Sequence, residues 1–153
     1  MLKRIDLNDR LAVNELWYLQ HASYKVEAEL IGFSQIPPLL DTLDTLQNCG
    51  EQVIAYEADG EMAGALAYTT EGRTAEICRM MVHPDYFRQE IASKLLEYVE
   101  DNSGCSHFIV STGTLNEPAI RLYRKHGFQE TGRTEVVPGV WITHFSKSIT
   151  ERG

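Results

Sequence analysis

Residues 82–96, VHPDYFRQEIASKLL, join the end of an expected strand to the start of an expected helix. An apolar run ends at Val82, and Pro84 cannot continue the hydrogen-bond ladder of a central strand. Apolar residues then recur at helical spacing, at Ile91, Leu95, Leu96 and Val99. The first turn of a helix carries unpaired N–H groups at the positive end of its dipole. The sequence therefore predicts an anion site here, well suited to a phosphate.

A second stretch, residues 116–128 (NEPAIRLYRKHGF), has the pattern of a capped helix followed by a strand. Asn116 is a favourable N-cap, and Pro118 lies in the tolerant first turn. Ala119 and Leu122 share one helix face, and Gly127 supplies a stop. Local physics explains each of these residues singly, so their joint spacing carries the functional information.

Together the two stretches resemble the GNAT superfamily of N-acetyltransferases. The first is similar to the acyl-CoA-binding motif of that family, Gln/Arg-x-x-Gly-x-Gly/Ala after a Val-x-Pro strand end. Ala92 fits this motif, whereas Phe87 replaces the Gln or Arg and Glu90 replaces the central Gly. The second stretch matches every fixed position of the GNAT pattern N-x-x-A-x-x-L-Y-x-x-x-G-F.

The resemblance implies transfer of an acetyl group from acetyl-CoA to a primary amine, by direct attack in a ternary complex and without a metal. In the family, a splayed strand edge supplies the hydrogen-bond donor for the thioester oxygen. By position, the backbone of Met80 would do this and Val82 would hold the pantetheine arm, while the backbone from Arg88 onward would bind the diphosphate. The cofactor-binding residues implied in this way are Met80, Val82, Phe87, Arg88, Gln89, Glu90, Ile91, Ala92 and Asn116.

The resemblance also implies two proton transfers. Tyr123 matches the general acid that protonates the departing thiolate; the alternative is an aromatic ring that packs beneath the cofactor. For the amine, Glu76 is the expected base, and it shares the strand side of Met80 and Val82 if no bulge intervenes. The alternative is a water-facing Glu76, with the amine deprotonated through ordered water.

The family builds its acceptor sites from the long first helix and the last strand. Tyr24, Glu27 and His144, the last with Trp141 and Phe145 nearby, are therefore candidates for lining an acceptor pocket. Small amines, antibiotics, polyamines, amino acids and protein N-termini all stay open as acceptors. The oligomeric state also stays open, a homodimer included.

Glu90 opposes cofactor binding. A carboxylate roughly 6 Å from a diphosphate costs on the order of 1–3 kcal/mol, and a Cβ obstructs the close backbone approach that Gly permits. Glu in a first helical turn complements the helix dipole, and Arg88 could offset part of the repulsion. An alternative function is therefore a GNAT-fold binding or regulatory protein with weakened or lost CoA affinity. A third hypothesis, a module that binds another nucleotide, leaves residues 116–128 unexplained.

Composition excludes several other classes of protein. A net charge of −8 and a pI of about 5.1 argue against a nucleic-acid partner, which requires a basic face. Cys49, Cys78 and Cys105 are isolated, which disfavours zinc or disulfide frameworks and favours a reducing compartment. No apolar leader or membrane-length segment is present in the sequence, so we expect a cytoplasmic protein without a membrane partner. No G-x-S-x-G elbow supports a Ser-His-Asp hydrolase.

The remaining chain supplies the elements that would position these residues. The expected order is a strand (2–7), a helix (9–32), a second helix (37–48), strands 52–58, 61–69 and 74–82, a helix (88–101), a strand (107–111), a helix (116–127) and two strands around Pro138. Asp59–Gly60 predicts a hairpin, and Gly64 predicts the close approach of another element. This order predicts one α/β (α+β) domain over residues 1–153. The resemblance implies a GNAT-type three-layer fold, a mostly antiparallel mixed sheet of about seven strands flanked by four helices.

Overall fold

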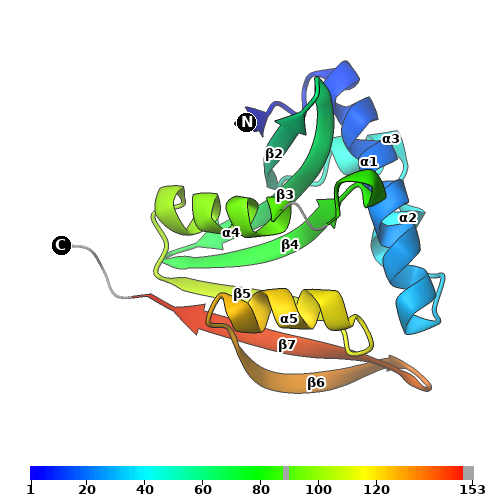
Figure 1. The fold of residues 1–153 in the computed structure, drawn as a ribbon, viewed down its shortest axis with the longest axis vertical. Coiled ribbons are helices and arrows are strands. Elements are labelled where there is room, and N and C mark those ends of the chain that lie inside the picture. The colour runs from blue at the N-terminus through cyan, green and yellow to red at the C-terminus, as the bar shows by residue number, and fades with distance from the viewer. Residues whose placement is uncertain (88–89, 150–153) are drawn as a thin grey trace.

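A seven-stranded sheet with the strand order β1-β2-β3-β4-β5-β7-β6 forms the centre of the molecule (Figure 1). The computed structural model describes residues 1–87 and 90–149. The strands are β1 Leu2–Ile5, β2 Gln52–Ala58, β3 Glu61–Glu71, β4 Thr74–Val82, β5 His107–Gly113, β6 Gln129–Val137 and β7 Val140–Ser148. Only β4 and β5 pair in parallel, so the predicted mixed and mostly antiparallel sheet is confirmed.

Five α-helices accompany the sheet in the described part of the chain, one more than expected. They are α1 Arg10–Ile31, α2 Pro37–Leu40, α3 Leu43–Gln47, α4 Ile91–Asn102 and α5 Glu117–Lys125, with a 3-10 turn η1 at Pro84–Tyr86. The single helix expected over residues 37–48 is wrong. Thr42 is extended there and caps α3 through a reciprocal capping box with Thr45, which ends the preceding turn.

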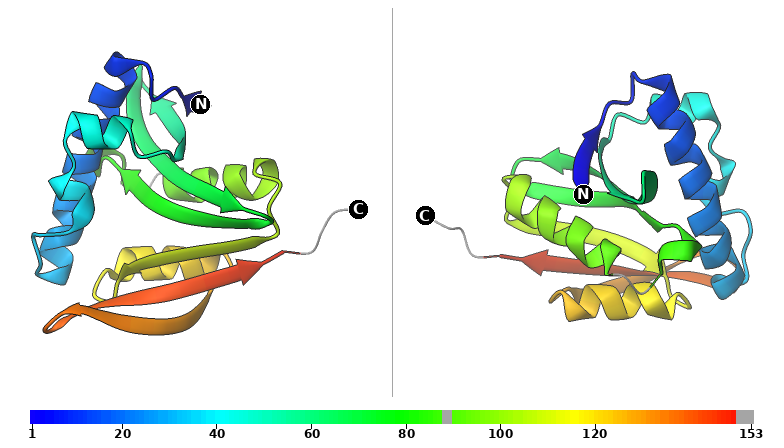
Figure 2. Two further views of the ribbon diagram at one scale, coloured as in Figure 1. Left: turned by 180° about the vertical axis from the view of Figure 1, so that it is seen from behind. Right: turned by 45° about the horizontal axis from the view of Figure 1, so that its top comes forward.

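The helices cover both faces of the sheet (Figures 1 and 2). Helices α4 and α5 bury one face over a core that includes Leu66, Leu95 and Phe108. Helices α1 to α3 cover β2 to β4 on the other face, over Leu16, Val53 and Met81. Three layers result, as expected.

Gly64 in β3 lets α4 approach the sheet closely. A Cβ at this position would lie 2.6 Å from the Cγ2 atom of Ile91. The first turn of α4 therefore rests directly on the centre of the sheet. This contact positions the helix start predicted to bind an anion.

The parallel pair β4 and β5 is short. Thr74–Ile77 of β4 pairs with His107–Val110 of β5, and the pairing stops there although both strands continue. The two strands diverge beyond this point, which opens the sheet at its centre. Among the described residues, no helix has the length and apolar composition needed to cross a membrane.

Candidate active site

The diverging end of β4 presents backbone N–H groups that no neighbouring strand accepts. The Met80 amide donates instead to the Tyr24 hydroxyl, at 3.0 Å between N and Oη. The Val82 amide donates to the Ser23 hydroxyl, at 3.1 Å between N and Oγ. Both hydroxyls come from α1, which crosses the open edge. The two amides expected to hold the thioester and the pantetheine arm therefore face side-chain oxygens.

A cleft of about 530 Å³ runs past these amides between α1, the end of β4 and the first turns of α4 and α5. Every described member of the expected cofactor set lines it: Met80, Val82, Phe87, Glu90, Ile91, Ala92 and Asn116. Arg88 and Gln89 lie outside the described residues. The backbone thus brings together residues that are widely separated in the sequence, while their role as cofactor ligands stays a prediction.

Glu90 occupies the left-handed region, at φ 59° and ψ 23°, immediately before the first residue of α4. An L-residue is strained in this conformation, whereas Gly adopts it readily, which explains why the family motif places Gly here. The turn also delays the helix, which begins at Ile91 rather than at residue 88 as expected. The Glu90 carboxylate is exposed and lies 3.3 Å from the Lys125 ammonium of α5.

A second cavity of about 480 Å³ adjoins this cleft and opens between α1, β5 and the β6–β7 hairpin. The two spaces share five lining residues, Glu27, Met80, Asn116, Ala119 and Leu122. The Met80 amide therefore stands where the cleft meets the second cavity.

Tyr123 lines the second cavity from α5 and is only 3% exposed. Its ring packs against Phe128 and Phe145, with ring centroids 5.6 and 5.9 Å away. Burial, and the nearby Tyr24 and Glu27, raise the pKa of Tyr123 well above its ordinary value. Its hydroxyl forms no hydrogen bond within residues 1–87 and 90–149. The phenol therefore stays protonated at neutral pH and can donate.

Glu27 is the carboxylate at the junction of the two cavities. Its Oε1 atom accepts a hydrogen bond from the Thr112 hydroxyl at 3.1 Å. That hydroxyl in turn accepts from the Asn116 amide nitrogen at 3.3 Å. The N-cap residue of α5 thereby fixes the carboxylate through Thr112. Sequence reasoning placed Glu27 only in an acceptor pocket; the available signal was its spacing from Tyr24, which puts both on one face of α1.

Glu76 lies elsewhere: it was expected to share the side of Met80 and Val82 if no bulge intervened, but β4 contains a bulge. Tyr68 pairs with Ile77 and Ala67 pairs with Arg79, so Cys78 is an extra residue in β4. This β-bulge shifts the alternation by one position, and Ile77 and Met80 consequently pack on the same core. Glu76 is exposed and lines neither cavity.

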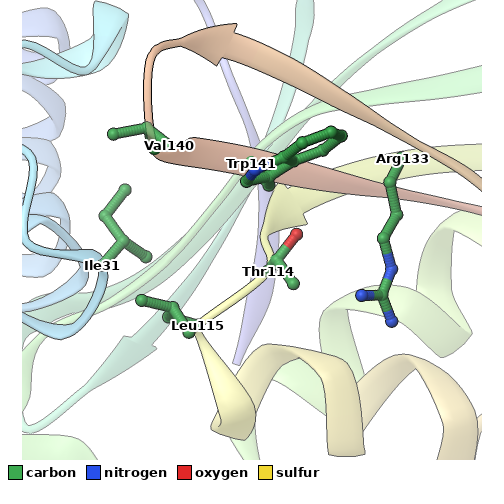
Figure 3. Close-up of a pocket in the computed structure, with 7 residues that line it drawn as sticks. Ile31, Thr114, Leu115, Arg133, Val140 and Trp141 are labelled. Atoms are coloured by element: carbon green, nitrogen blue, oxygen red, sulfur yellow. The ribbon is translucent and has the colours of Figure 1, made fainter.

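The other acceptor candidates separate in the structure. Tyr24 lines the second cavity with Glu27, whereas His144 accepts or donates hydrogen bonds to Ser111 and Thr134 at 2.6 and 2.7 Å and lines neither space. Phe145 is buried beneath Tyr123. Trp141 lines a smaller hollow of about 380 Å³, here called the outer hollow (Figure 3). Within the described residues, no group of His, Cys, Asp and Glu side chains is arranged to hold a metal ion.

Sequence comparisons give the family context. A UPF0157 protein, YqkA, of Bacillus subtilis (strain 168) is 31% identical over 146 residues, which cover 95% of this chain and 43% of that protein. An IAA acetyltransferase of Azospirillum brasilense is 40% identical over 99 residues, which cover 61% of this chain and 64% of that protein. The chain thus spans less than two thirds of the length of these relatives.

A solved structure shares the fold. The yncA protein of Salmonella typhimurium, solved with its cofactor acetyl-CoA, aligns with a TM-score of 0.73 at 18% identity over 100% of this chain and 95% of that chain. The family model of the acetyltransferase (GNAT) domain matches residues 49–130, which include β2 to α5 and both motif stretches. The chain belongs to the GNAT acetyltransferase family.

Proposed function

We propose that this chain transfers an acetyl group from acetyl-CoA to a primary amine by direct attack in a ternary complex. The observation that carries the proposal is the position of the Met80 amide, where a cleft lined by helix starts meets a cavity containing Tyr123 and Glu27. One space suits a long anionic cofactor, and the other suits a compact acceptor.

The cleft has features that fit acetyl-CoA. The hydroxyls of Tyr24 and Ser23 occupy the positions that carbonyl oxygens of the thioester and pantetheine would take on Met80 and Val82. The first turn of α4 offers amide donors to a diphosphate. The exposed Glu90 carboxylate is paired with Lys125, which reduces its repulsion of the phosphates. This pairing favours the enzyme over the alternative of a GNAT-fold regulator without CoA affinity.

The residues at the junction supply the chemistry. The Met80 N–H stabilises the negative charge that develops on the thioester oxygen. The amine nitrogen attacks the carbonyl carbon, the carbon–sulfur bond breaks, and the Tyr123 hydroxyl gives its proton to the departing thiolate. Glu27 accepts the proton that the amine loses. We assign this role to Glu27 rather than Glu76, because Glu27 lines both spaces and Glu76 lines neither.

The first test combines acetyl-CoA titration by calorimetry with thiol release over a panel of amines. Parent protein is expected to bind acetyl-CoA and release thiol with at least one amine. Absence of both would refute the proposal.

Matched variants test the assigned roles. Tyr123→Phe and Glu27→Gln are each expected to lower kcat by about 10²-fold or more while acetyl-CoA affinity changes little. Glu76→Gln, the control, is expected to retain the parent rate. Loss of activity in Glu76→Gln with a fully active Glu27→Gln would reverse the assignment. The cytoplasmic location, the one-domain organisation and the homodimer remain predictions from the sequence.

A further inference from the structure

We infer that the acceptor is an apolar monoamine, an amine with a hydrocarbon or aromatic body and no second charge near the reacting nitrogen. This inference rests on the proposed function and on the second cavity, hereafter the acceptor cavity. Its lining excludes most of the acceptors that the family resemblance left open.

The walls of the acceptor cavity are mainly apolar. Helix α1 and the loop that follows contribute Ile31, Phe33 and Ile36, and the β6–β7 hairpin contributes Val137, Val140 and Ile142. An ammonium or carboxylate against these walls would lose its water without gaining an opposite charge, at a large cost. A hydrocarbon body gains free energy by the same burial.

Glu27 is the single carboxylate among the described residues that line this cavity. It lies at the inner end, beside Met80 and Tyr123. One ammonium can therefore find a counter-ion there. A diamine, polyamine or aminoglycoside would bring further ammonium groups against the apolar walls.

Arg79 is the single cation among the described lining residues, and its guanidinium is already engaged. Its Nε and Nη2 atoms donate to the two Glu51 oxygens at 2.9 and 3.2 Å. Its Nη1 atom donates to Gln20 at 3.0 Å and also to Asp41. Two carboxylates thus neutralise one guanidinium that is only 12% exposed. An amino-acid carboxylate would find no cation and would face the negative Glu27.

The outer hollow continues the acceptor cavity, because Ile31 and Val140 line both. In Figure 3, Trp141 and Leu115 lie along its sides, and Arg133 of β6 lies on the side opposite Ile31. Arg133 lines only this outer hollow, where its guanidinium lies 3.3 Å from the Glu130 carboxylate. An apolar tail too long for the acceptor cavity would therefore contact the exposed Trp141 ring in the outer hollow.

Matched acceptor pairs test the inference in the thiol-release assay with acetyl-CoA. Tryptamine is compared with tryptophan, which adds a carboxylate beside the amine. Isoamylamine is compared with cadaverine, which has the same number of carbon atoms and adds a second ammonium. The monoamine of each pair is expected to have a kcat/KM about 100-fold higher. The tryptophan carboxylate would lie roughly 6 Å from the like charge of Glu27, and the second ammonium of cadaverine would lose water against apolar walls.

A charge placed in the cavity wall gives a second measurement. Val137 is 38% exposed, so a polar substitution there is expected to leave the fold intact. Val137→Asp is expected to raise the kcat/KM ratio of cadaverine to isoamylamine roughly fivefold, because it provides a second counter-ion. Val137→Asn has a similar size without the charge and is expected to leave the ratio unchanged.

The outcomes separate the inference from the proposed function. Turnover of tryptophan or cadaverine at or above the rate of its monoamine partner overturns the inference, while acetyl transfer itself stands. Acetyl-CoA binding without turnover of either monoamine also overturns it. Failure to bind acetyl-CoA, with no turnover of any amine, overturns the proposed function as well.

Discussion

Glu90 combines a strained backbone conformation with a negative charge that would lie near the diphosphate of the proposed cofactor. A φ of 59° costs an L-residue roughly 1–2 kcal/mol, and a Gly at this position would avoid that cost. The Gly would also increase the conformational entropy of the unfolded chain, which offsets part of the gain. We expect Glu90→Gly to raise the free energy of unfolding by about 0.5–1 kcal/mol in urea titrations. We also expect acetyl-CoA to bind about tenfold more tightly by calorimetry, because the charge and the Cβ are both removed.

Two controls divide these effects. Asp59 has a φ of 54° in the β2–β3 hairpin and lines neither the cleft nor the acceptor cavity. Asp59→Gly should therefore stabilise the fold without changing acetyl-CoA affinity. Glu90→Gln removes the charge and keeps the strained backbone. Equal affinity in the parent, Glu90→Gln and Glu90→Gly would mean that the Glu90 side chain does not affect the cofactor.

The sequence predicts some site residues better than others, for a physical reason. The positions of Tyr123 and Asn116 can be predicted from the sequence, because one continuous helix, α5, contains Tyr123 and is capped by Asn116. Local residues specify the cap and the end of that helix. The sequence does not predict the position of Glu27, because Glu27 is on α1, its partner Thr112 is on β5, and only tertiary packing brings them to 3.1 Å. Ser23 was missed because a hydroxyl on a helix surface has no sequence signature.

Helix α1 occupies hydrogen-bond donors at the open edge of β4 that the proposed cofactor would also need. In the free protein the Tyr24 hydroxyl accepts from the Met80 amide, which an acyl-CoA carbonyl would also need. Tyr24→Phe leaves this amide without that acceptor and is expected to destabilise the free protein by about 1–3 kcal/mol. Acetyl-CoA would restore an acceptor, so the thermal shift it induces should be larger in Tyr24→Phe than in the parent.

Tyr18 provides the matched control for this prediction, because it is 66% exposed on the same helix. Tyr18→Phe should change neither stability nor the thermal shift. A smaller acetyl-CoA shift in Tyr24→Phe would contradict competition and indicate that the hydroxyl itself contacts the cofactor.

Arg79 of β4 forms a salt bridge with Asp41, which lies between α2 and α3. Burial alone would raise the pKa of Asp41, but hydrogen bonds from Arg79, Thr45 and Gln20 outweigh it and hold the pKa below its ordinary value. Its carboxylate therefore contributes stability above about pH 4, and this contribution is lost as the pH falls through the lowered pKa. We expect Asp41→Asn to cost about 1–3 kcal/mol at pH 7, with the difference from the parent shrinking below about pH 4 in urea unfolding.

Asp44 is the control for that pH dependence. It pairs with Arg10 at 3.0 Å, but its side chain is 82% exposed, so Asp44→Asn should cost under about 1 kcal/mol. A pH-independent difference between Asp41→Asn and the parent would show that Asp41 acts by packing rather than by charge.

The ends of helices and strands can be predicted from the sequence where neighbouring residues specify them. The αL turn at Gly32 ends α1, and Asp59–Gly60 joins β2 to β3, both as expected. The bulge at Cys78 was not predictable, because nothing in the sequence of β4 distinguishes the extra residue; its register is set by pairing with β3. Because of this extra residue, Glu76 lies on the opposite face of β4 from Met80 and Val82. The sequence placed Glu76, the expected base, on their face only in the absence of a bulge.

The sheet as a whole is two parts joined by four residue pairs between β4 and β5. The order and type of strands predicted this architecture, but the extent of the opening depends on where the pairing stops. The cleft lies across this opening, with the end of β4 and the start of α4 on one side and α5 on the other. A ligand in the cleft would therefore contact both parts at once.

We expect acetyl-CoA to stabilise both parts together. At about 100 times Kd, mass action predicts roughly 2.7 kcal/mol of added stability and a rise in Tm of about 5–10 °C for a chain of this size. Amide hydrogen exchange should slow both at Met80 and Val82 and in the first turn of α5, while the outer strands β1 and β6 change little. Protection confined to α4 would instead describe a phosphate ligand held at one helix start, since such a ligand would leave β4 and α5 uncoupled.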